Sequence, residues 1–222
     1  MKLKKIIVII CIFILVFLIY LTTIDRKIYY LNIGDNLSTS TKYSDEISKY
    51  LYSKHKLEKT IEFISNDYRT TDLIRDIKDN KVIKINNKNQ TIKNALIKAD
   101  LLTISIGKND IYYKLTSNDL DKIYDYADSI ISDIRNLLTI IREYCKEDII
   151  FIGIIDYNTN YPEVIDYINN KIKIICNRNK INFIDINKYF IESDINNNNI
   201  SNSGSKKLVL NLKKIINKTT LK

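Results

Sequence analysis

The sequence has few of the residues that mark tight turns, disulfide frameworks and metal sites. Its 222 residues include four glycines, one proline, three cysteines and one histidine. Few turns can rely on glycine. The cysteines form no CxxC pair and no Cys/His cluster, which excludes a disulfide framework and a zinc site. Cys11 lies in an apolar run, and Cys145 and Cys176 lie near the ends of expected helices, where buried small residues are usual. Whether those two pair depends on geometry.

Two further kinds of ligand site are missing. No GxGxxG or GxxxxGK[ST] segment is present, so the sequence predicts no nucleotide site. Asp194, Asn196 and Asn198 begin like a calcium loop, but Asn199 replaces the required glycine and Ser205 the terminal glutamate. We therefore expect neither a metal nor a cofactor.

Composition and charge favour one globular domain. Apolar residues make up 45% of the chain and charged residues 27%, which is typical of folded proteins. The formal charge of +9 would suit an anionic partner. The lysines, however, are dispersed among acidic residues, as in Lys114 to Lys122, and form no strip with interleaved aromatics. This pattern argues against nucleic-acid binding.

The N-terminal segment has the pattern of a membrane anchor. Lys2, Lys4 and Lys5 precede an uncharged run from Ile6 to Ile24, close to the roughly 20 residues that cross a bilayer core. No A-x-A-like cleavage site follows, and the residues before Cys11 are too bulky for a lipoprotein signal. We expect residues 1–24 to form an uncleaved transmembrane helix; a cleaved signal peptide is the alternative.

The flanking charges predict the orientation of this anchor. Lysines before the run would stay in the cytoplasm, while Asp25 and Arg26 follow it. Residues 25–222 are then a single domain on the extracytoplasmic side of the cell membrane.

Beyond the anchor, apolar runs alternate with segments of helical spacing. Strands are expected over residues 28–33, 60–64, 101–106, 148–155 and 181–186. Helices are expected over 44–52, 73–77, 95–99, 123–141, 164–175 and 206–216, with Ser117 as a cap before the longest one and a loop around Asn87 to Asn89.

Continuous apolar strands separated by helices are typical of a parallel sheet that is buried on both faces. The expected fold is a three-layer αβα domain with a doubly wound, flavodoxin-like sheet. In such sheets ligands bind at the carboxyl ends of the strands. The residues that follow Ile33, Ile64, Ile106 and Ile186 are therefore the informative ones.

Those positions carry four short motifs in order. The first strand leads into Gly34-Asp35-Asn36-Leu37-Ser38, and the third into Gly107-Lys108-Asn109-Asp110. Asp67 to Leu73 lies between them, and Asn198 to Gly204 follows near the end. Together they resemble the four conserved blocks of the SGNH/GDSL ester hydrolases, the last with its glycine two positions early. The resemblance implies that family's fold and an ester-cleaving ancestry.

The resemblance also implies a role for each motif. The family places a serine nucleophile in the first block, oxyanion donors in the second and third, and an aspartate and a histidine base in the last. Asn36 stands at the nucleophile position, Asp67 at the glycine donor, Asn198 at the aspartate and Ser201 at the histidine. Only Asn109 keeps the family residue.

No other residue is an evident substitute. His55, the single histidine, lies before the second strand, at the amino-terminal edge of the expected sheet and opposite the site. Ser38 is two residues beyond the nucleophile position, so its side chain should point elsewhere. Asp194 could supply a carboxylate to the last loop, but it would have no histidine to orient.

The sequence therefore predicts a catalytically impaired hydrolase relative that binds an ester, lipid or glycan ligand, or a partner, in the residual cleft. Two rivals stay open. One is an active hydrolase that uses Ser38, or Asp35 with Asp67; the other is a surface-interaction module whose cleft holds no ligand. The oligomeric state is not predicted.

The predicted orientation has a direct test. Protease added to intact spheroplasts should degrade residues 25–222, because the lysine flank of the anchor holds only the N-terminus inside. Immunoblotting before and after lysis gives the answer. A domain that is protected until the cells are lysed would show that the orientation is reversed.

Overall fold

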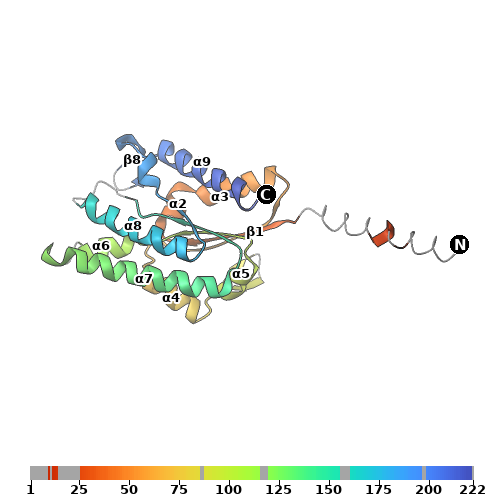
Figure 1. Cartoon of the computed structure of the whole chain (residues 1–222), viewed down its shortest axis with the longest axis horizontal. Coiled ribbons are helices and arrows are strands. Elements are labelled where there is room, and N and C mark those ends of the chain that lie inside the picture. The colour runs from red at the N-terminus through yellow and green to blue at the C-terminus, as the bar shows by residue number, and fades with distance from the viewer. Residues whose placement is uncertain are drawn as a thin grey trace.

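The computed structural model describes residues 10, 12–14, 26–85, 88–115, 120–155, 161–196 and 199–221. In these ranges a central sheet lies between two layers of helices (Figure 1). The expected anchor over residues 1–24 lies largely outside the described residues. Among the residues that are described, no helix is both long enough and apolar enough to span a bilayer.

The sheet contains β1 (Ile28–Gly34), β2 (Leu57–Ile64), β5 (Leu101–Ser105), β6 (Asp148–Ile152) and β7 (Asn182–Ile184). All neighbouring pairs are parallel, in the order β2-β1-β5-β6-β7. Counted along the chain within this sheet, that is the 2-1-3-4-5 order of flavodoxin-like folds. The strand order reverses between β1 and β5, which is the expected position of a ligand site.

Buried apolar runs explain why the central strands are covered on both faces. Every residue of β1 and of β5 is buried. In β1, Leu31 and Ile33 pack on one side of the sheet, whereas Ile28 and Tyr30 pack on the other. This alternation follows from the two-residue period of a strand.

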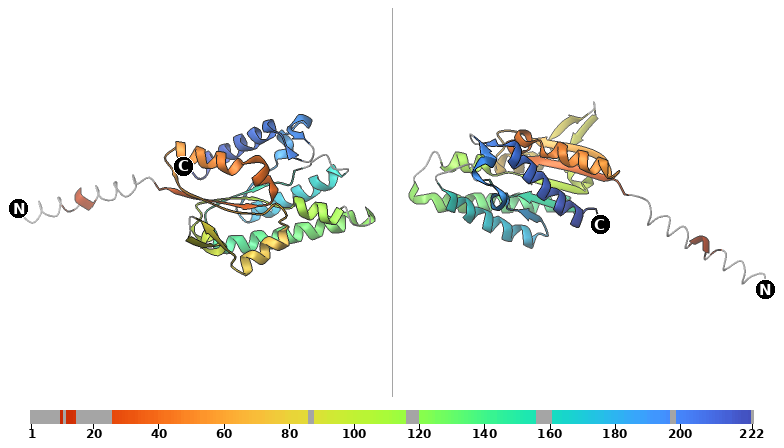
Figure 2. Two further views of the ribbon diagram at one scale, coloured as in Figure 1. Left: turned by 180° about the vertical axis from the view of Figure 1, so that it is seen from behind. Right: turned by 90° about the horizontal axis from the view of Figure 1, so that it is seen from above.

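Two helical layers cover the faces (Figure 2). One face is covered by α4 (Thr70–Lys78), α5 (Ile92–Lys98), α7 (Ile123–Tyr144) and α8 (Pro162–Arg178). The other face is covered by α3 (Tyr43–Ser53) and α9 (Asn202–Lys218). The helical spacing in the sequence thus places six expected helices correctly, and α7 is indeed the longest.

Some elements differ from the expectation. The polar stretch around Asn87 to Asn89, expected to be loop, contributes to a hairpin of β3 (Val82–Ile85) and β4 (Lys88–Thr91). Two helices were not expected: α2 (Asn36–Thr41) and α6 (Lys108–Leu115). Both are short and begin within a motif at a strand end, where a glycine and polar residues suggested only a turn. The expected cap Ser117 lies outside the described residues.

The strand at residues 148–155 ends earlier than expected, at Ile152, because Gly153 to Ile155 continue apolar and buried without pairing as strand. The remaining elements are single turns, η1 (Leu120–Lys122), η2 (Ile186–Tyr189) and η3 (Glu192–Asp194), and the two-residue strands β8 (Ile195–Asn196) and β9 (Asn199–Ile200).

The two domain cysteines are unpaired. Cys145 and Cys176 are buried free thiols. Burial raises the pKa of Cys145 to about 11 and that of Cys176 to about 12. Both are therefore held as neutral, unreactive thiols that pack as small apolar side chains.

Candidate functional site

Three of the four motifs meet at the carboxyl ends of β1, β2 and β5. Gly34, the last residue of β1, is paired with Ile64 of β2 and with Ser105 of β5. Beyond the strands, the Asp35 N–H donates to the Ser105 carbonyl over 2.9 Å, and the Ser65 N–H donates to the Gly34 carbonyl over 3.1 Å. The turns after Gly34 and Gly107 thus lie on one edge of the sheet, as the sequence predicted.

Gly34 is required by this close approach. A Cβ at that position would lie 2.1 Å from the backbone oxygen of Ser105. No side chain fits there without separating β1 from β5. The glycine therefore allows the first motif to lie directly against the third.

Asp35 occupies the centre of the junction. It is 2% exposed and caps α2, since its carboxylate accepts the Leu37 N–H over 3.2 Å. Burial raises the pKa of Asp35 to about 7, while the Leu37 N–H and the charge of Lys108 act in the opposite direction. Burial also lowers the pKa of the half-buried Lys108, an effect that Asp35 opposes.

This acid and amine border a small hollow at the point where the strand order reverses. Its lining is otherwise mostly apolar. The lining residues are Asp35, Leu37, Ser105, Ile106, Lys108, Ile152, Gly153, Ile154 and Ile155. The hollow places two ionisable side chains beside apolar walls.

Asn109, the only one of the five predicted site positions that keeps the family's residue, is fully engaged. Its amide nitrogen donates to the backbone carbonyls of Asn66 and Tyr68, each over 2.8 Å. An amide nitrogen carries two hydrogens, so both are used. In this arrangement Asn109 ties the third motif to the second and has no N–H left for an oxyanion.

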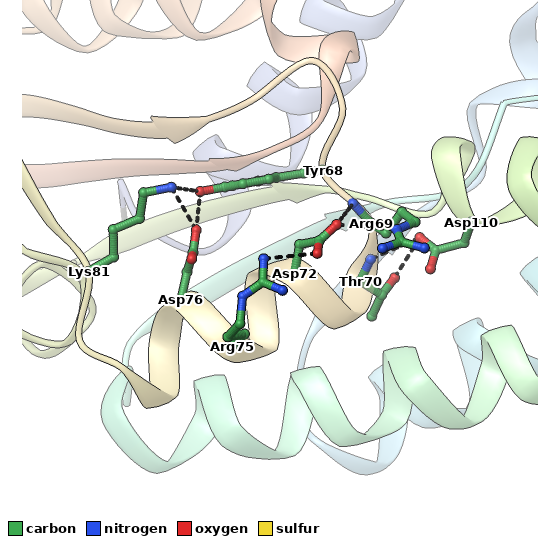
Figure 3. A network of polar contacts seen from close by, with 8 residues as sticks. All are labelled: Tyr68, Arg69, Thr70, Asp72, Arg75, Asp76, Lys81 and Asp110. Carbon is green, nitrogen blue, oxygen red and sulfur yellow. Dashed lines mark hydrogen bonds and ion pairs between the residues drawn. The ribbon is translucent and has the colours of Figure 1, made fainter.

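A buried carboxylate reinforces the same junction. Asp110 is 3% exposed and accepts both the N–H and the hydroxyl of Thr70, each over 2.9 Å (Figure 3). Burial raises the pKa of Asp110, and the two Thr70 hydrogen bonds oppose this rise. These contacts join the start of α6 to the start of α4.

The exposed side of the junction carries an arginine. Arg69 lies 3.3 Å from the Asp72 carboxylate, and its guanidinium stacks over the Tyr113 ring at 4.9 Å. Figure 3 shows Arg69 beside Thr70 and Asp110, while Lys81, Asp76 and Tyr68 form a separate group farther along α4. Asp67 is exposed in the turn between β2 and α4.

Ser38 lies in a buried polar cluster and does not face the hollow as a free hydroxyl. It is 2% exposed and lies within hydrogen-bonding distance of the Tyr43 hydroxyl at 3.0 Å and the Ser105 hydroxyl at 3.2 Å. Tyr43 in turn donates to the Asn32 side chain over 2.7 Å. No histidine belongs to this cluster, so Ser38 has no base to activate it.

The fourth motif packs against α2 through the first turn of α9. Ser201 is the N-cap of α9 and accepts the Gly204 N–H over 3.3 Å. The Ser205 hydroxyl donates to the Thr41 carbonyl at the end of α2. Asn36 begins α2, about 8 Å along the helix from Thr41. Asn198 lies outside the described residues, as does the side chain of Asn36.

Asp194 has a structural partner. Its fully buried carboxylate pairs with Lys207 at 2.5 Å and accepts the Ile191 N–H over 2.9 Å. Burial opposes the charge, but the Lys207 ammonium and the Ile191 N–H keep the pKa of Asp194 below its ordinary value. This ion pair holds η3 against α9.

His55 lies on the opposite edge of the sheet. It occupies the turn between α3 and β2 with a left-handed φ of 57°. β2 has eight residues, so its two ends are roughly 23 Å apart. A catalytic base must come within about 3 Å of its proton donor.

Within the described ranges, no group of three or more His, Cys, Asp and Glu side chains is placed to hold a metal ion.

The comparisons with known proteins agree at the level of fold. No family model matches the sequence, and no curated protein matches it. Among solved structures, an acetylxylan esterase from Geobacillus stearothermophilus, Axe2, is similar with a TM-score of 0.64 and 15% identity over 87% of this chain and 95% of that one. A lipase from a goat rumen metagenome is similar with a TM-score of 0.66 and 16% identity over 83% and 95%.

These two proteins are SGNH-type hydrolases, and this chain has their parallel-sheet α/β fold. The similar structures include variants of the esterase described as catalytic mutants, in which a serine, an aspartate or a histidine is replaced by alanine. The family resemblance of the four motifs is thus matched by the fold. The identities are low, so the likeness concerns the fold alone.

Sequence reasoning missed two features of the site. Lys108 occupies the variable position of the third motif, so the family pattern gave no reason to select it. The engagement of Asn109 was also missed, because its partners are backbone carbonyls that lie 43 and 41 positions earlier in the chain. A charged residue next to a glycine at the strand-order reversal was the available signal for Lys108.

The raised pKa of Asp35 predicts a pH-dependent stability. Between the ordinary carboxyl pKa and about 7, the folded chain keeps a proton that the unfolded chain has released, so stability falls as pH rises. Asp35→Asn keeps the capping oxygen but cannot ionise. From about pH 5 to about pH 8, wild type should lose roughly 2 kcal/mol relative to this variant in urea unfolding. If the unfolding free energies of wild type and Asp35→Asn change equally with pH, the pKa of Asp35 is not raised.

Proposed function

We propose that this chain is a membrane-anchored, extracytoplasmic protein with the SGNH-hydrolase fold that no longer hydrolyses esters by a serine mechanism. Its role is to bind a ligand at the carboxyl edge of the sheet. The observation that carries this proposal is the position of His55, the only histidine in the sequence, at the far end of β2. An imidazole roughly 23 Å from the motifs cannot act as their base.

The oxyanion donors support the same conclusion. Removing one such donor from a protease costs about 10² to 10³ in kcat. Here the Asn109 amide donates both of its hydrogens to the loop of the second motif, and the family's glycine position in that loop is Asp67. Loss of a nucleophile or a base costs on the order of 10⁶. Together these losses leave no ordinary esterase turnover.

The hollow beside Asp35 and Lys108 supports a binding role. It combines apolar walls with an acid whose pKa is about 7 and with an amine. A ligand with a small apolar group next to a hydrogen-bonding atom fits this chemistry. An acyl group on an ester, lipid or glycan has both features, and Axe2 is an esterase of acetylated xylan.

One observation favours a second candidate. A buried carboxyl whose pKa is about 7 is suited to general acid–base chemistry near neutral pH. In this alternative Asp35 activates a water molecule directly, without a serine. It predicts a turnover that survives Asn36→Ala and is lost in Asp35→Asn.

Turnover of p-nitrophenyl acetate by the full chain in detergent distinguishes these readings. The proposal predicts that wild type and Asn36→Ala hydrolyse the ester at the same low rate, because Asn36 has no nucleophilic oxygen. Wild-type activity clearly above Asn36→Ala would contradict the proposal. Activity that is equal in those two proteins but lost in Asp35→Asn would support the second candidate.

Repair of the missing groups gives a matched positive test. Asn36→Ser alone should recover little, because nucleophile and base act as a unit. The triple variant Asn36→Ser, Asn198→Asp, Ser201→His has the best chance of turnover, and adding Asp67→Gly removes a carboxylate from the donor position. Since Asn109 is engaged, we expect even the repaired protein to stay about 10² below a complete site.

A further inference from the structure

The segment that precedes each strand of the central sheet contains at least one exposed basic side chain. Because the strands are parallel, these segments lie on one edge, which we call the basic edge. Its residues are Arg26 and Lys27 before β1, Lys54 before β2, Lys98 before β5, Lys146 before β6 and Lys180 before β7. Lys78, Arg178 and Lys218, exposed in the last turns of α4, α8 and α9, add to it.

Acidic residues on this edge are fewer. Glu58, Asp79, Glu143 and Glu147 are exposed there, and the half-buried Asp100 pairs with Arg26. At the opposite edge the exposed charges are mixed. The exposed charges there are Lys42, Lys122, Lys188, Lys206, Asp67, Asp121, Asp125, Glu163 and Glu192. The positive charge of the domain is therefore concentrated at the end remote from the candidate site.

Helix ends explain only part of this pattern. Basic side chains are favourable at helix C-termini, where carbonyl groups are exposed. Lys146 follows this rule, since its ammonium donates to the Arg142 carbonyl in the last turn of α7 over 2.9 Å. Lys180, however, lies beyond the last residue of α8, and Lys27 directly precedes β1. A second cause is needed for these two.

The length of the connection to the apolar run supplies that cause. Three residues separate Ile24, the last residue of the run, from Ile28, the first of β1. Even fully extended, this connection spans no more than about 14 Å. The start of β1 and the C-terminus lie at the same end of the domain (Figure 2). If the run crosses the membrane, this end is held within reach of the lipid head groups.

We propose that the basic edge rests on a membrane surface rich in anionic lipid. This inference depends on the membrane anchoring proposed above. The connection is short enough to let exposed lysines of this edge come within about one Debye length, some 8–10 Å, of the bilayer charge. The short connection brings the edge to the surface, and the charge of the edge fixes the orientation of the domain.

The orientation sets the position of the candidate site. β1 has seven residues, so its carboxyl end stands roughly 20 Å from its start. The hollow at Asp35 then faces away from the bilayer. Lipids of the same membrane cannot reach it without leaving the bilayer, so a soluble or polymeric ligand such as a glycan fits this geometry.

The absence of tryptophan from the sequence makes the orientation measurable. Tyr52, 73% exposed near the end of α3, lies close to the basic edge, and Tyr112, 71% exposed on α6, lies at the site end. Tyr52→Trp and Tyr112→Trp are therefore matched single-tryptophan probes. The full chain is reconstituted into phosphatidylcholine vesicles with or without phosphatidylglycerol, each containing a lipid with a spin label on its head group.

We expect the label to quench Tyr52→Trp at least twofold more than Tyr112→Trp in vesicles with phosphatidylglycerol, and high salt to reduce the difference. Neutralising the edge by Lys54→Gln with Lys180→Gln should reduce it as well. Lys122→Gln with Lys188→Gln removes the same charge at the site end and should leave the quenching of Tyr52→Trp unchanged.

The outcomes distinguish a failure of the proposed docking of the basic edge from a failure of the proposed membrane anchor. Equal quenching of both probes, stronger quenching of Tyr112→Trp, or no dependence on phosphatidylglycerol would overturn the docking of the basic edge while the anchor stands. Extraction of the chain from the vesicles by sodium carbonate would instead show that the apolar run is not an anchor, and both proposals would fail.

Discussion

The parallel contact between β1 and β5 is the constraint on which the rest of the molecule depends. Gly34 lies so close to the Ser105 carbonyl that no side chain fits between the two strands. That approach places the turn after β1 against the turn after β5, at the point where the strand order reverses. Asp35, Lys108 and Asn109 are neighbours because of it, although more than 70 positions separate Asp35 from the other two.

The polar groups at this junction stabilise the fold and leave little for catalysis. Asn109 donates both amide hydrogens to the backbone, Asp110 accepts two hydrogen bonds from Thr70, and Ser38 is part of a buried cluster. Buried polar groups need such partners, because an unsatisfied one costs about 1–3 kcal/mol. In this arrangement the donors at the junction contribute to the stability of the fold. Asp35 and Lys108 are the exception, since their burial shifts both pKa values toward neutrality.

The sequence predicted the central layers because their signals are local and repetitive. Continuous apolar runs marked β1 and β5, and 3.6-residue spacing marked α7. The short helices α2 and α6 were missed, since a glycine followed by polar residues is equally typical of a turn. The hairpin of β3 and β4 was missed because its second strand, Lys88–Thr91, is polar.

The sequence predicted the position of the candidate site better than it predicted the chemistry of the side chains there. A strand-end rule and the order of four motifs located the junction. The identities of Asn36 and Ser201 already argued against a serine mechanism. The raised pKa of Asp35 could not be predicted, because it depends on burial beneath neighbours that only the fold brings together. The same is true of the two carbonyl partners of Asn109.

The central claim is that no serine of this protein is activated as a nucleophile. Its most direct test is to treat the full chain with a fluorophosphonate probe and measure its intact mass, with an active serine esterase as a positive control. The account predicts that the esterase gains one probe mass and that this chain gains none. A stoichiometric adduct that peptide mapping assigns to a single serine, such as Ser38, would contradict it.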